Sequence, residues 1–312
     1  MNNITPIISV VIPVYNGAKT IKETMESVLQ QTYQNFEIIA INDGSTDDTL
    51  AIINSIQDPR IKVFCYANAG LSASRNRGFD RACGEFIAFL DADDLWTNDK
   101  LEAQLEALQQ NPQAAVAYSW TDHIDEYGKF LRPASYTSCN GNIYERLLVG
   151  NFLACGSNTL IRAQSLTQVG GFDESLNSAE DWDMWLRLAA LYEFVAVSRP
   201  QVLYRISPYS MSANISKMEI ASLQVIERAY SQAPESLQYL KKEALGFVYK
   251  FLMYKALQDN VKRQRGLKAA KVLFKYLKQD SSLLQLGRLK LYLLFKVITA
   301  NLLPFYQTTI EW

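Results

Sequence analysis

The sequence lacks the features of several well-known protein classes. Its four cysteines include no CxxC pair and no metal-ligand spacing, so we expect reduced thiols and no disulfide framework. No stretch reaches the roughly 18 uninterrupted apolar residues of a membrane-spanning helix. The N-terminal segment MNNITPIISVVIP also lacks the basic region of a signal peptide. These absences favour a cytoplasmic protein without a spanning helix.

The sequence also lacks the glycine-rich loops that bind phosphate in many nucleotide-binding proteins. It contains neither GxGxxG nor GxxxxGK[ST], so a bound diphosphate would have to be neutralised by other groups. Histidine is nearly absent as well. The only one, His123, follows the apolar run Ala114–Trp120, and we expect it to lie in a loop.

The net charge of −1 conceals an asymmetry along the chain. Residues 241–312 contain 14 Lys and Arg against 4 Asp and Glu, whereas residues 1–240 contain 17 against 28. The basic tail either packs with its lysines in water or docks on an anionic membrane surface. It has no nucleic-acid recognition motif, so nucleic acid is not an expected partner.

Short β-branched runs alternate with helical patterns over residues 1–120. This alternation predicts an α/β fold with a mostly parallel sheet and helices on both faces. The expected strands are Ile7–Val14, Glu37–Asn42, Lys62–Ala67, Phe86–Leu90 and Ala114–Trp120, and the expected helices are Lys19–Thr32, Thr46–Ile56, Leu71–Cys83 and Asn98–Gln110, with Asp47 and Asn98 as N-caps. Further along we expect helices at Ile143–Val149 and Ala179–Leu191, strands at Ser157–Arg162, Phe194–Val197 and Val202–Arg205, and helices from Lys217 onward.

Carboxylates follow the predicted strands where a ligand is expected. In open α/β sheets, ligands bind beyond the carboxyl ends of the strands. Asn42-Asp43-Gly44-Ser45 follows the second run, and Asp91-Ala92-Asp93-Asp94 follows the fourth. Mg²⁺ and Mn²⁺ take oxygen ligands, and few of them from protein when phosphates supply the rest. One or two of these carboxylates would therefore suffice to hold such a cation.

Each of these segments has a simpler interpretation when it is taken alone. Asp43-Gly44-Ser45 is also typical of a turn that enters a helix, and Asp-x-Asp is common on protein surfaces. Arg75 in LSASRNRG is compatible with a solvated charge, and acids such as Glu180 and Asp181 complement a helix dipole. The combination of such segments at consecutive strand ends is what favours a ligand site.

Four segments in this order resemble the inverting family 2 nucleotide-sugar glycosyltransferases. They are VVIPVYNG at 10–17, INDGSTDDT at 41–49, GLSASRNRGFDRACGEFIAFLDADD at 70–94 and GGFDESLNSAEDWDMWLRLA at 170–189. The resemblance covers residues 7–206 and implies the GT-A fold. It implies a catalytic domain at 1–216, with a nucleotide-binding half at 1–120 and an acceptor half at 121–216, and it leaves 217–312 as a basic helical region.

The resemblance implies a base pocket formed by Pro13, Tyr15 and Asn16. Asp43 would accept a hydrogen bond from the imide of the base, which favours uracil or thymine over bases that show no such donor. Arg75 would reach the base or the pyrophosphate, because a guanidinium pairs well with phosphate oxygens.

The resemblance further implies that Asp91 holds the ribose hydroxyls and that Asp93 ligates Mn²⁺ or Mg²⁺. Such a metal bridges the diphosphate and stabilises it as a leaving group. Many relatives carry a histidine after the strand that ends in Tyr-Arg, but the segment after Arg205 has none here. The metal would therefore have mainly Asp93, phosphates and water around it.

On the acceptor side, the resemblance makes Asp181 the catalytic base and Glu180 its acidic neighbour. Gly171 would lie in a turn that approaches the donor sugar, and Trp182 is a candidate for stacking on an acceptor sugar. Attack opposite the leaving group would invert the anomeric centre.

The expected activity is transfer of a sugar from a UDP-sugar to a hydroxyl of a glycan or lipid-linked acceptor in cell-surface polysaccharide biosynthesis. The expected location is the cytoplasm, including the inner face of the cell membrane. Two alternatives stay open. One is a nucleotide-sugar-binding subunit without catalysis, and the other is a sugar nucleotidyltransferase, against which the missing glycine-rich N-terminal signature argues.

Overall fold

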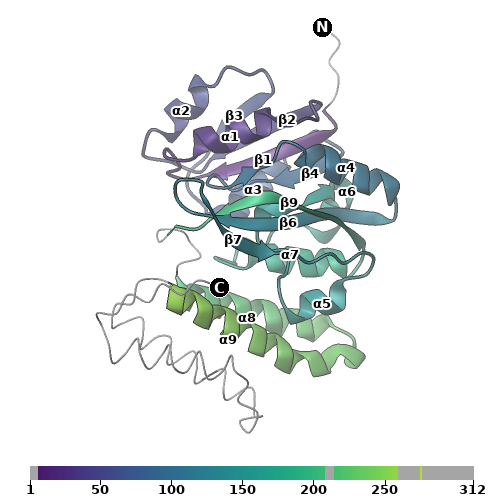
Figure 1. Ribbon diagram of the computed structural model, residues 1–312. Helices are drawn as coiled ribbons and strands as arrows, with labels where there is room; N and C mark the ends of the chain where they lie inside the picture. The colour runs from purple at the N-terminus through teal and green to yellow at the C-terminus, as the bar shows by residue number, and fades with distance from the viewer. Residues whose placement is uncertain (1–5, 208–213, 259–274, 276–312) are drawn as a thin grey trace, which may run out of the picture. The chain divides into compact units, whose positions relative to one another are not determined.

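The computed structural model describes residues 6–207, 214–258 and 275 (Figure 1). The chain divides into two compact units. The first comprises Met1–Leu147 and Asn151–Ser207, and the second comprises Leu148–Gly150 and Pro208–Trp312. This division into compact units does not test the functional boundary expected at residue 216. That boundary stays a prediction.

The first unit contains one mixed sheet with the strand order β3-β2-β1-β4-β8-β6-β9-β5, and β7 pairs with β6. β1 is parallel to β2 and β4, and β6 is parallel to β9. Because β8 is antiparallel to both β4 and β6, these two strands point in the same direction. The strands are β1 (Ile8–Val14), β2 (Phe36–Asn42), β3 (Ile61–Cys65), β4 (Phe86–Phe89), β5 (Leu95–Trp96), β6 (Ala114–Ile124), β7 (Phe130–Ser135), β8 (Leu160–Arg162) and β9 (Glu193–Arg205).

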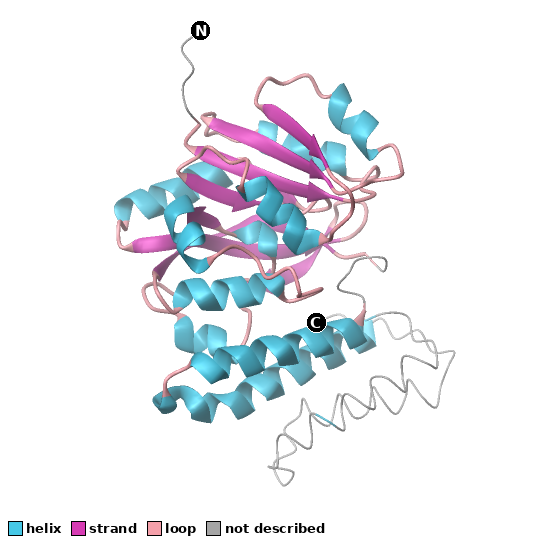
Figure 2. Cartoon of the chain, turned by 180° about the vertical axis from the view of Figure 1, so that it is seen from behind, coloured by secondary structure: helices cyan, strands magenta, loops and turns pink. Residues whose placement is uncertain are grey.

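Burial on both faces explains the apolar runs of the central strands. Every residue of β1, β2 and β4 is buried, and helices flank the sheet on both faces (Figure 2). Ile21, Met25 and Val28 of α1 are buried at helical spacing and belong to the same apolar core as the strands. The helices of this unit are α1 (Ile21–Leu29), α2 (Thr49–Ser55), α3 (Leu71–Phe79), α4 (Lys100–Gln110), α5 (Tyr144–Val149, which continues into the second unit), α6 (Ala163–Val169) and α7 (Glu180–Ala189).

The predicted α/β class is confirmed, but His123 does not lie in a loop. It lies within β6, which continues to Ile124 instead of ending at Trp120. The last residues of β6 pair with β9, and Ile124 pairs with Arg205. This pairing is possible because β9 is one long strand, where the sequence predicted two. The expected strand Ser157–Arg162 is a 3-10 turn, η1 (Gly156–Asn158), followed by β8.

The two predicted N-caps are each displaced by one residue. Asp48 and Asp99 occupy the N-cap positions of α2 and α4. The Asp47 carboxylate accepts hydrogen bonds from the backbone N–H groups of Ala18 and Thr49, both at 3.1 Å, so it joins the loop after β1 to the start of α2.

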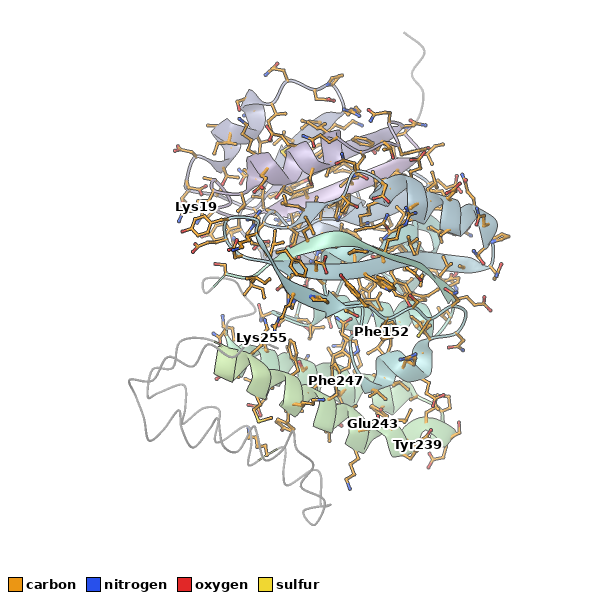
Figure 3. The ribbon with its side chains drawn as sticks, viewed as in Figure 1. Lys19, Phe152, Tyr239, Glu243, Phe247 and Lys255 are labelled. Carbon is orange, nitrogen blue, oxygen red and sulfur yellow. The ribbon has the colours of Figure 1, made fainter. Side chains whose placement is uncertain are left out.

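The second unit is helical where it is described. It contains α8 (Ile215–Gln232), the 3-10 helix η3 (Glu235–Leu240) and α9 (Lys241–Gln258), and α8 packs against α9. Tyr239, Glu243 and Phe247 follow one another along η3 and α9 (Figure 3). The helices expected from Lys217 onward are confirmed for α8 and α9, whereas residues beyond 258, apart from 275, lie outside the described part of the chain. No helix in the described parts of the chain has the length and apolar character needed to cross a membrane.

Candidate active site

The carboxyl ends of parallel strands bring the predicted site residues to one edge of the sheet. β1, β2 and β4 run in the same direction, and Tyr15, Asp43 and Asp91 follow their ends. β6 runs in the same direction as β4, so its last residues reach the same edge. This is the edge at which open α/β sheets bind ligands.

Asn16 joins the loop after β1 to the loop after β2. Its Oδ1 accepts a hydrogen bond from the backbone N–H of Thr46 at 2.8 Å, and its own N–H donates to Ser45 Oγ at 3.0 Å. Pro13 is buried within β1, whereas the side chain of Tyr15 is 55% exposed beside it. The exposed ring provides a flat surface on which a base can stack.

Asp43 is buried and fixed by three donors. Its carboxylate accepts hydrogen bonds from the N–H groups of Ala69 and Gly70, at 3.0 and 2.9 Å, and from Arg77 Nη1 at 3.0 Å. Gly70 has a φ of 91°, which favours glycine at this position. Sequence reasoning singled out Arg75 in this segment and missed Arg77, which is the arginine that pairs with Asp43.

Arg75 links the segment after β4 to the start of α7. Its Nη2 donates to Asp91 Oδ1 at 2.6 Å and its Nη1 donates to Glu180 Oε1 at 2.7 Å. Burial disfavours its charge, but the two carboxylates outweigh burial and raise the pKa of Arg75. A Cβ at Gly156 would lie 2.4 Å from Nη2, so the glycine leaves room for the guanidinium.

The side chain of Arg75 is only 1% exposed. The Phe172 ring covers it as well, with its centroid 5.1 Å from the guanidinium carbon. A nucleotide could touch Arg75 only after these neighbours had moved. The predicted contact with a base or pyrophosphate therefore stays a prediction, and in this structure the partners of Arg75 are carboxylates.

Three aspartates form an acidic cluster after β4. Burial and the nearby charge of Asp91 raise the pKa of Asp93 to about 6. Asp94 is an internal residue: its carboxylate accepts hydrogen bonds from Ser157 Oγ at 2.5 Å and from the N–H of Arg205 at 3.0 Å. Burial also raises the pKa of Asp94. Asp91 and Asp93 are half-buried, so they are the members of the cluster that a ligand can reach.

Asp181 opens α7 and titrates near neutrality. Burial and the adjacent Glu180 raise its pKa to about 7, while the charge of Arg75 opposes this rise. Its Oδ2 accepts a hydrogen bond from Asn151 Nδ2 at 3.2 Å, and its Oδ1 accepts one from the N–H of Trp182 at 2.7 Å. A carboxylate with a pKa near the working pH is suited to accept a proton as a general base.

Two other predicted residues have different surroundings from those expected. Trp182 is 3% exposed and its Nε1 donates to the carbonyl of Leu147 at 2.8 Å, so its indole offers no face to a sugar. Gly171 has a φ of 75°, and a Cβ there would lie 2.8 Å from Asn76 Oδ1. The same oxygen accepts the N–H of Phe172, so the close approach at Gly171 is to Asn76.

Comparison with known proteins identifies the family to which this chain belongs. Residues 9–258 match the family described as "Glycosyltransferase like family 2". The chain is a member of that family. A protein of Escherichia coli named UDP-Glc:alpha-D-GlcNAc-diphosphoundecaprenol beta-1,3-glucosyltransferase WfgD is 32% identical over 213 residues, which cover 67% of this chain and 80% of WfgD.

Other relatives of this family 2 glycosyltransferase are longer proteins. The chondroitin synthase of Escherichia coli is 29% identical over 237 residues, which cover 75% of this chain and 33% of that protein. An uncharacterized glycosyltransferase of Rickettsia bellii is 37% identical over 184 residues, which cover 59% of this chain and 26% of that protein. The chain thus spans a third or less of the first curated relatives that it matches.

Solved structures confirm the GT-A type of fold. S. aureus TarS 1–349 in complex with UDP-GlcNAc has a TM-score of 0.59 at 19% identity, covering 87% of this chain and 88% of TarS 1–349. The mannosyltransferase PcManGT of Pyrobaculum calidifontis, in complex with GDP-Man and Mn²⁺, has a TM-score of 0.61 at 17% identity, covering 97% of this chain and 89% of PcManGT. At these identities the likeness is one of fold alone.

The acidic cluster of the glycosyltransferase fits a divalent cation. The described residues contain no group of three or more His, Cys, Asp or Glu arranged to hold a metal. Mg²⁺ and Mn²⁺ need only one or two protein carboxylates when a diphosphate supplies other ligands. Burial and, after it, the charge of Asp91 raise the pKa of Asp93, and a bound cation would offset both effects. These two residues are the candidates to hold it.

Asn151 is a residue beside Asp181 that sequence reasoning missed. It lies in NFLACGSN, outside the four segments that carry the family resemblance, and only its contact with Asp181 reveals it. Its Oδ1 also accepts the N–H of Leu153 at 3.2 Å, which fixes the orientation of the amide. No sequence signal distinguishes such a residue from an ordinary loop asparagine.

Proposed function

We propose that this glycosyltransferase transfers a sugar from a UDP-sugar to a hydroxyl of its acceptor with inversion, assisted by Mn²⁺ or Mg²⁺. The observation that carries the proposal is the network Asp91–Arg75–Glu180, which joins the acidic cluster to the segment that bears Asp181. A residue suited to hold the donor is thus joined through Arg75 to Glu180, the neighbour in sequence of a residue suited to accept a proton.

The donor would bind at the edge formed by the loops after β1 and β2. Pro13, Tyr15 and Asn16 would line the base pocket, with the exposed ring of Tyr15 against the base. The Asp43 carboxylate already accepts from Ala69, Gly70 and Arg77, and the N–H of Ala69 is shared between both oxygens, so an imide N–H would replace part of that shared bond. The relative WfgD, by its name, uses UDP-Glc, which supports uracil as the base.

Asp181 would remove the proton of the acceptor hydroxyl as that oxygen attacks the anomeric carbon. The bond to the diphosphate breaks on the opposite face of the sugar, which inverts the configuration. A divalent cation, when bound, neutralises charge on the departing diphosphate. Asp93 would hold that cation, Asp91 would hold the ribose hydroxyls, and Glu180 would keep the Arg75 network in place.

The acceptor is proposed to be a glycan or a lipid-linked sugar in cell-surface polysaccharide biosynthesis. The relative WfgD, by its name, acts on a sugar attached to diphosphoundecaprenol. A lipid-linked acceptor requires the enzyme to work at a membrane surface. The excess of 14 basic over 4 acidic residues in 241–312 supports docking on the anionic inner face of the cell membrane from the cytoplasm.

Two other functions are compatible with the fold. A nucleotide-sugar-binding subunit would bind the donor without turning it over, although Asp91, Asp93 and Asp181 are all present. A sugar nucleotidyltransferase would release diphosphate from a nucleoside triphosphate and a sugar phosphate. Assays of donor hydrolysis, sugar transfer and diphosphate release separate the three functions.

A screen of UDP-, dTDP- and GDP-sugars by thermal unfolding tests the proposal. A ligand that binds only the folded state raises the melting temperature. We expect UDP-sugars to raise it in Mn²⁺ or Mg²⁺ and not in EDTA, and we expect Asp93→Ala to lose this response while keeping the unliganded melting temperature. Stabilisation in EDTA equal to that in Mn²⁺, or a full response from Asp93→Ala, would contradict metal-assisted binding of the donor.

A further inference from the structure

A stacked aromatic pair lies on the hairpin formed by β6 and β7. The rings of Trp120 and Tyr136 are 4.6 Å apart and nearly parallel, with an interplanar angle of 14°. Trp120 Nε1 donates to Ser138 Oγ at 2.9 Å, and the Tyr136 hydroxyl donates to Asp122 Oδ1 at 2.7 Å. Tyr136 nevertheless remains 45% exposed. The pair is therefore a fixed aromatic surface that is open to solvent on the side of Tyr136.

The pair belongs to the edge of the sheet where the donor is proposed to bind. β6 points in the same direction as β4, and Trp120 and Asp122 lie in its last five residues. The end of β6 also adjoins the acidic cluster, because Ile124 pairs with Arg205 and Arg205 Nε donates to the carbonyl of Asp93 at 2.8 Å.

The face of β6 that carries the pair points toward the segment beside Asp181. Tyr118 lies on the same side of β6 as Trp120, because the Tyr118 hydroxyl donates to the carbonyl of Cys139 and Trp120 Nε1 donates to the adjacent Ser138. The Tyr118 ring meets the ring of Phe152 edge-on, with centroids 5.9 Å apart (Phe152 is labelled in Figure 3).

The end of β7 also contacts Phe152. The hydroxyl of Ser135, next to Tyr136, donates to the carbonyl of Phe152. Phe152 follows Asn151, whose amide bonds to Asp181. Two separate contacts thus place the stacked pair close to the segment that holds the base.

We propose that Trp120, Asp122 and Tyr136 form a subsite for one neutral sugar ring of the acceptor. The proposal rests on the glycosyl transfer proposed above. The C–H face of a pyranose is apolar and fits the open face of Tyr136, while a hydroxyl at its rim can donate to the Tyr136 hydroxyl, which the buried Asp122 carboxylate holds in place. Because the ring of Tyr136 is already fixed by Trp120 and Asp122, binding costs little side-chain entropy. The negative charge of Asp122 disfavours an acidic sugar at this position.

The test compares kinetic constants of full-length variants with the donor that the thermal screen identifies. The acceptor probes are disaccharides of glucose, galactose and N-acetylglucosamine. We expect Tyr136→Ala to raise the acceptor KM about three- to tenfold, the scale of one aromatic contact, without changing the donor KM. Tyr136→Phe keeps the ring and should have a smaller effect. Tyr127→Ala is the matched control, because Tyr127 lies 85% exposed between β6 and β7 but outside the pair.

Unchanged acceptor KM in Tyr136→Ala, or an equal rise in Tyr127→Ala, would overturn the subsite. If Tyr136→Ala lowers the melting temperature, Tyr136→Leu replaces it, because leucine keeps apolar bulk without an aromatic face. A wild-type enzyme that hydrolyses the donor but transfers to none of the disaccharides also overturns the subsite and leaves the donor chemistry intact. A wild-type enzyme that neither binds nor hydrolyses any nucleotide sugar contradicts the proposed function itself.

Discussion

Asp181 shows how burial adapts a single side chain to chemistry. An exposed aspartate is ionised well below neutrality, whereas burial and Glu180 raise the pKa of Asp181 to about 7. A general base acts in its ionised form, so the active fraction increases as the pH rises through the pKa. We expect kcat/KM, measured at constant metal from pH 5 to 9, to rise below about pH 7 and to level off above it.

Asp181→Asn removes the proposed base while keeping the shape of the side chain. Turnover should fall by a factor on the order of 10² or more, and donor affinity should stay within a few-fold. Asp183→Asn on the same helix is the control, because Asp183 pairs with Arg187 at 2.8 Å and this ion pair stabilises the helix. The control should lose stability and keep turnover. The assignment fails if both variants turn over at the wild-type rate, or if Asp181→Asn loses donor binding.

Lys100 shows the opposite effect of burial on a basic residue. Its side chain is fully buried, with Nζ 3.0 Å from Gln104 Oε1 and 4.1 Å from the centroid of the Trp96 ring. Burial lowers the pKa of Lys100 to about 7, whereas in the unfolded chain it returns to its ordinary value of 10.5. Between these two pH values the unfolded chain binds more protons than the folded protein, so this residue makes stability rise with pH.

Lys100→Met should remove that dependence on pH. Relative to the wild type, the variant should be most favoured near pH 6, and the difference should decrease by up to about 1.4 kcal/mol per pH unit above pH 7. Urea unfolding at pH 6, 7, 8 and 9 measures the difference. A constant difference across this range would show that Lys100 has the same protonation state in both forms.

At the scale of elements, the absence of a side chain at Gly156 lets η1 pack closely against Arg75 of α3. The turn η1 passes so close to Arg75 that an added Cβ would lie 2.4 Å from Nη2. Gly156→Ala should displace the guanidinium and loosen Asp91 and Glu180 together. We expect kcat to fall about tenfold or more, because small misplacements of reacting groups are costly.

Gly84→Ala is the matched control for Gly156→Ala. A Cβ at Gly84 would lie 2.6 Å from the N of Ser9, an equally close approach, but just before the start of β4 at the opposite edge of the sheet. Both variants should unfold at lower temperature, and only Gly156→Ala should lower the kcat of the folded enzyme. Equal kcat values in the two folded variants would mean that the Arg75 network has no part in turnover.

At the scale of the whole molecule, the distribution of charge predicts where the enzyme works. Residues 241–312 carry an excess of basic over acidic residues, 14 against 4, although the chain is nearly neutral. If this region docks on a membrane, the protein should co-sediment with anionic liposomes at low salt and be released as salt rises, because surface attraction decays within about 8–10 Å. Neutral liposomes should bind it less well.

Substituting Lys262, Lys268 and Lys271 with Gln should weaken liposome binding, by about 1 kcal/mol per lysine. The control variant carries the same three changes at the exposed residues Lys19, Lys22 and Lys129, with an equal loss of charge outside the tail. A full-length protein that is monodisperse and ignores anionic liposomes at low salt would show that these lysines are a solvated surface.

The elements that could be predicted from the sequence are those that a strong local pattern encodes. β1, β2 and β4 are buried on both faces, so their runs are apolar except for Ser9, Glu37 and Asn42, and their ends are easily placed. β7 (FLRPAS) was missed because it is exposed and contains a proline, and only its pairing with β6 makes it a strand. The unexpected length of β6 has the same cause, since β9 extends beside it.

The sequence alone determined which residues stand at the strand ends, because alternating strands and helices bring the carboxyl ends of parallel strands to one edge. It thereby predicted the acids of the site, and four motifs predicted the family. Only the tertiary structure decided the partner of each charge. Arg75 meets Glu180 across 105 positions of the chain, Asp43 pairs with Arg77 and not with Arg75, and Asn151 reaches Asp181. Burial and neighbouring charges arise only on packing, so the near-neutral pKa of Asp181 is a property of the fold and not of its motif.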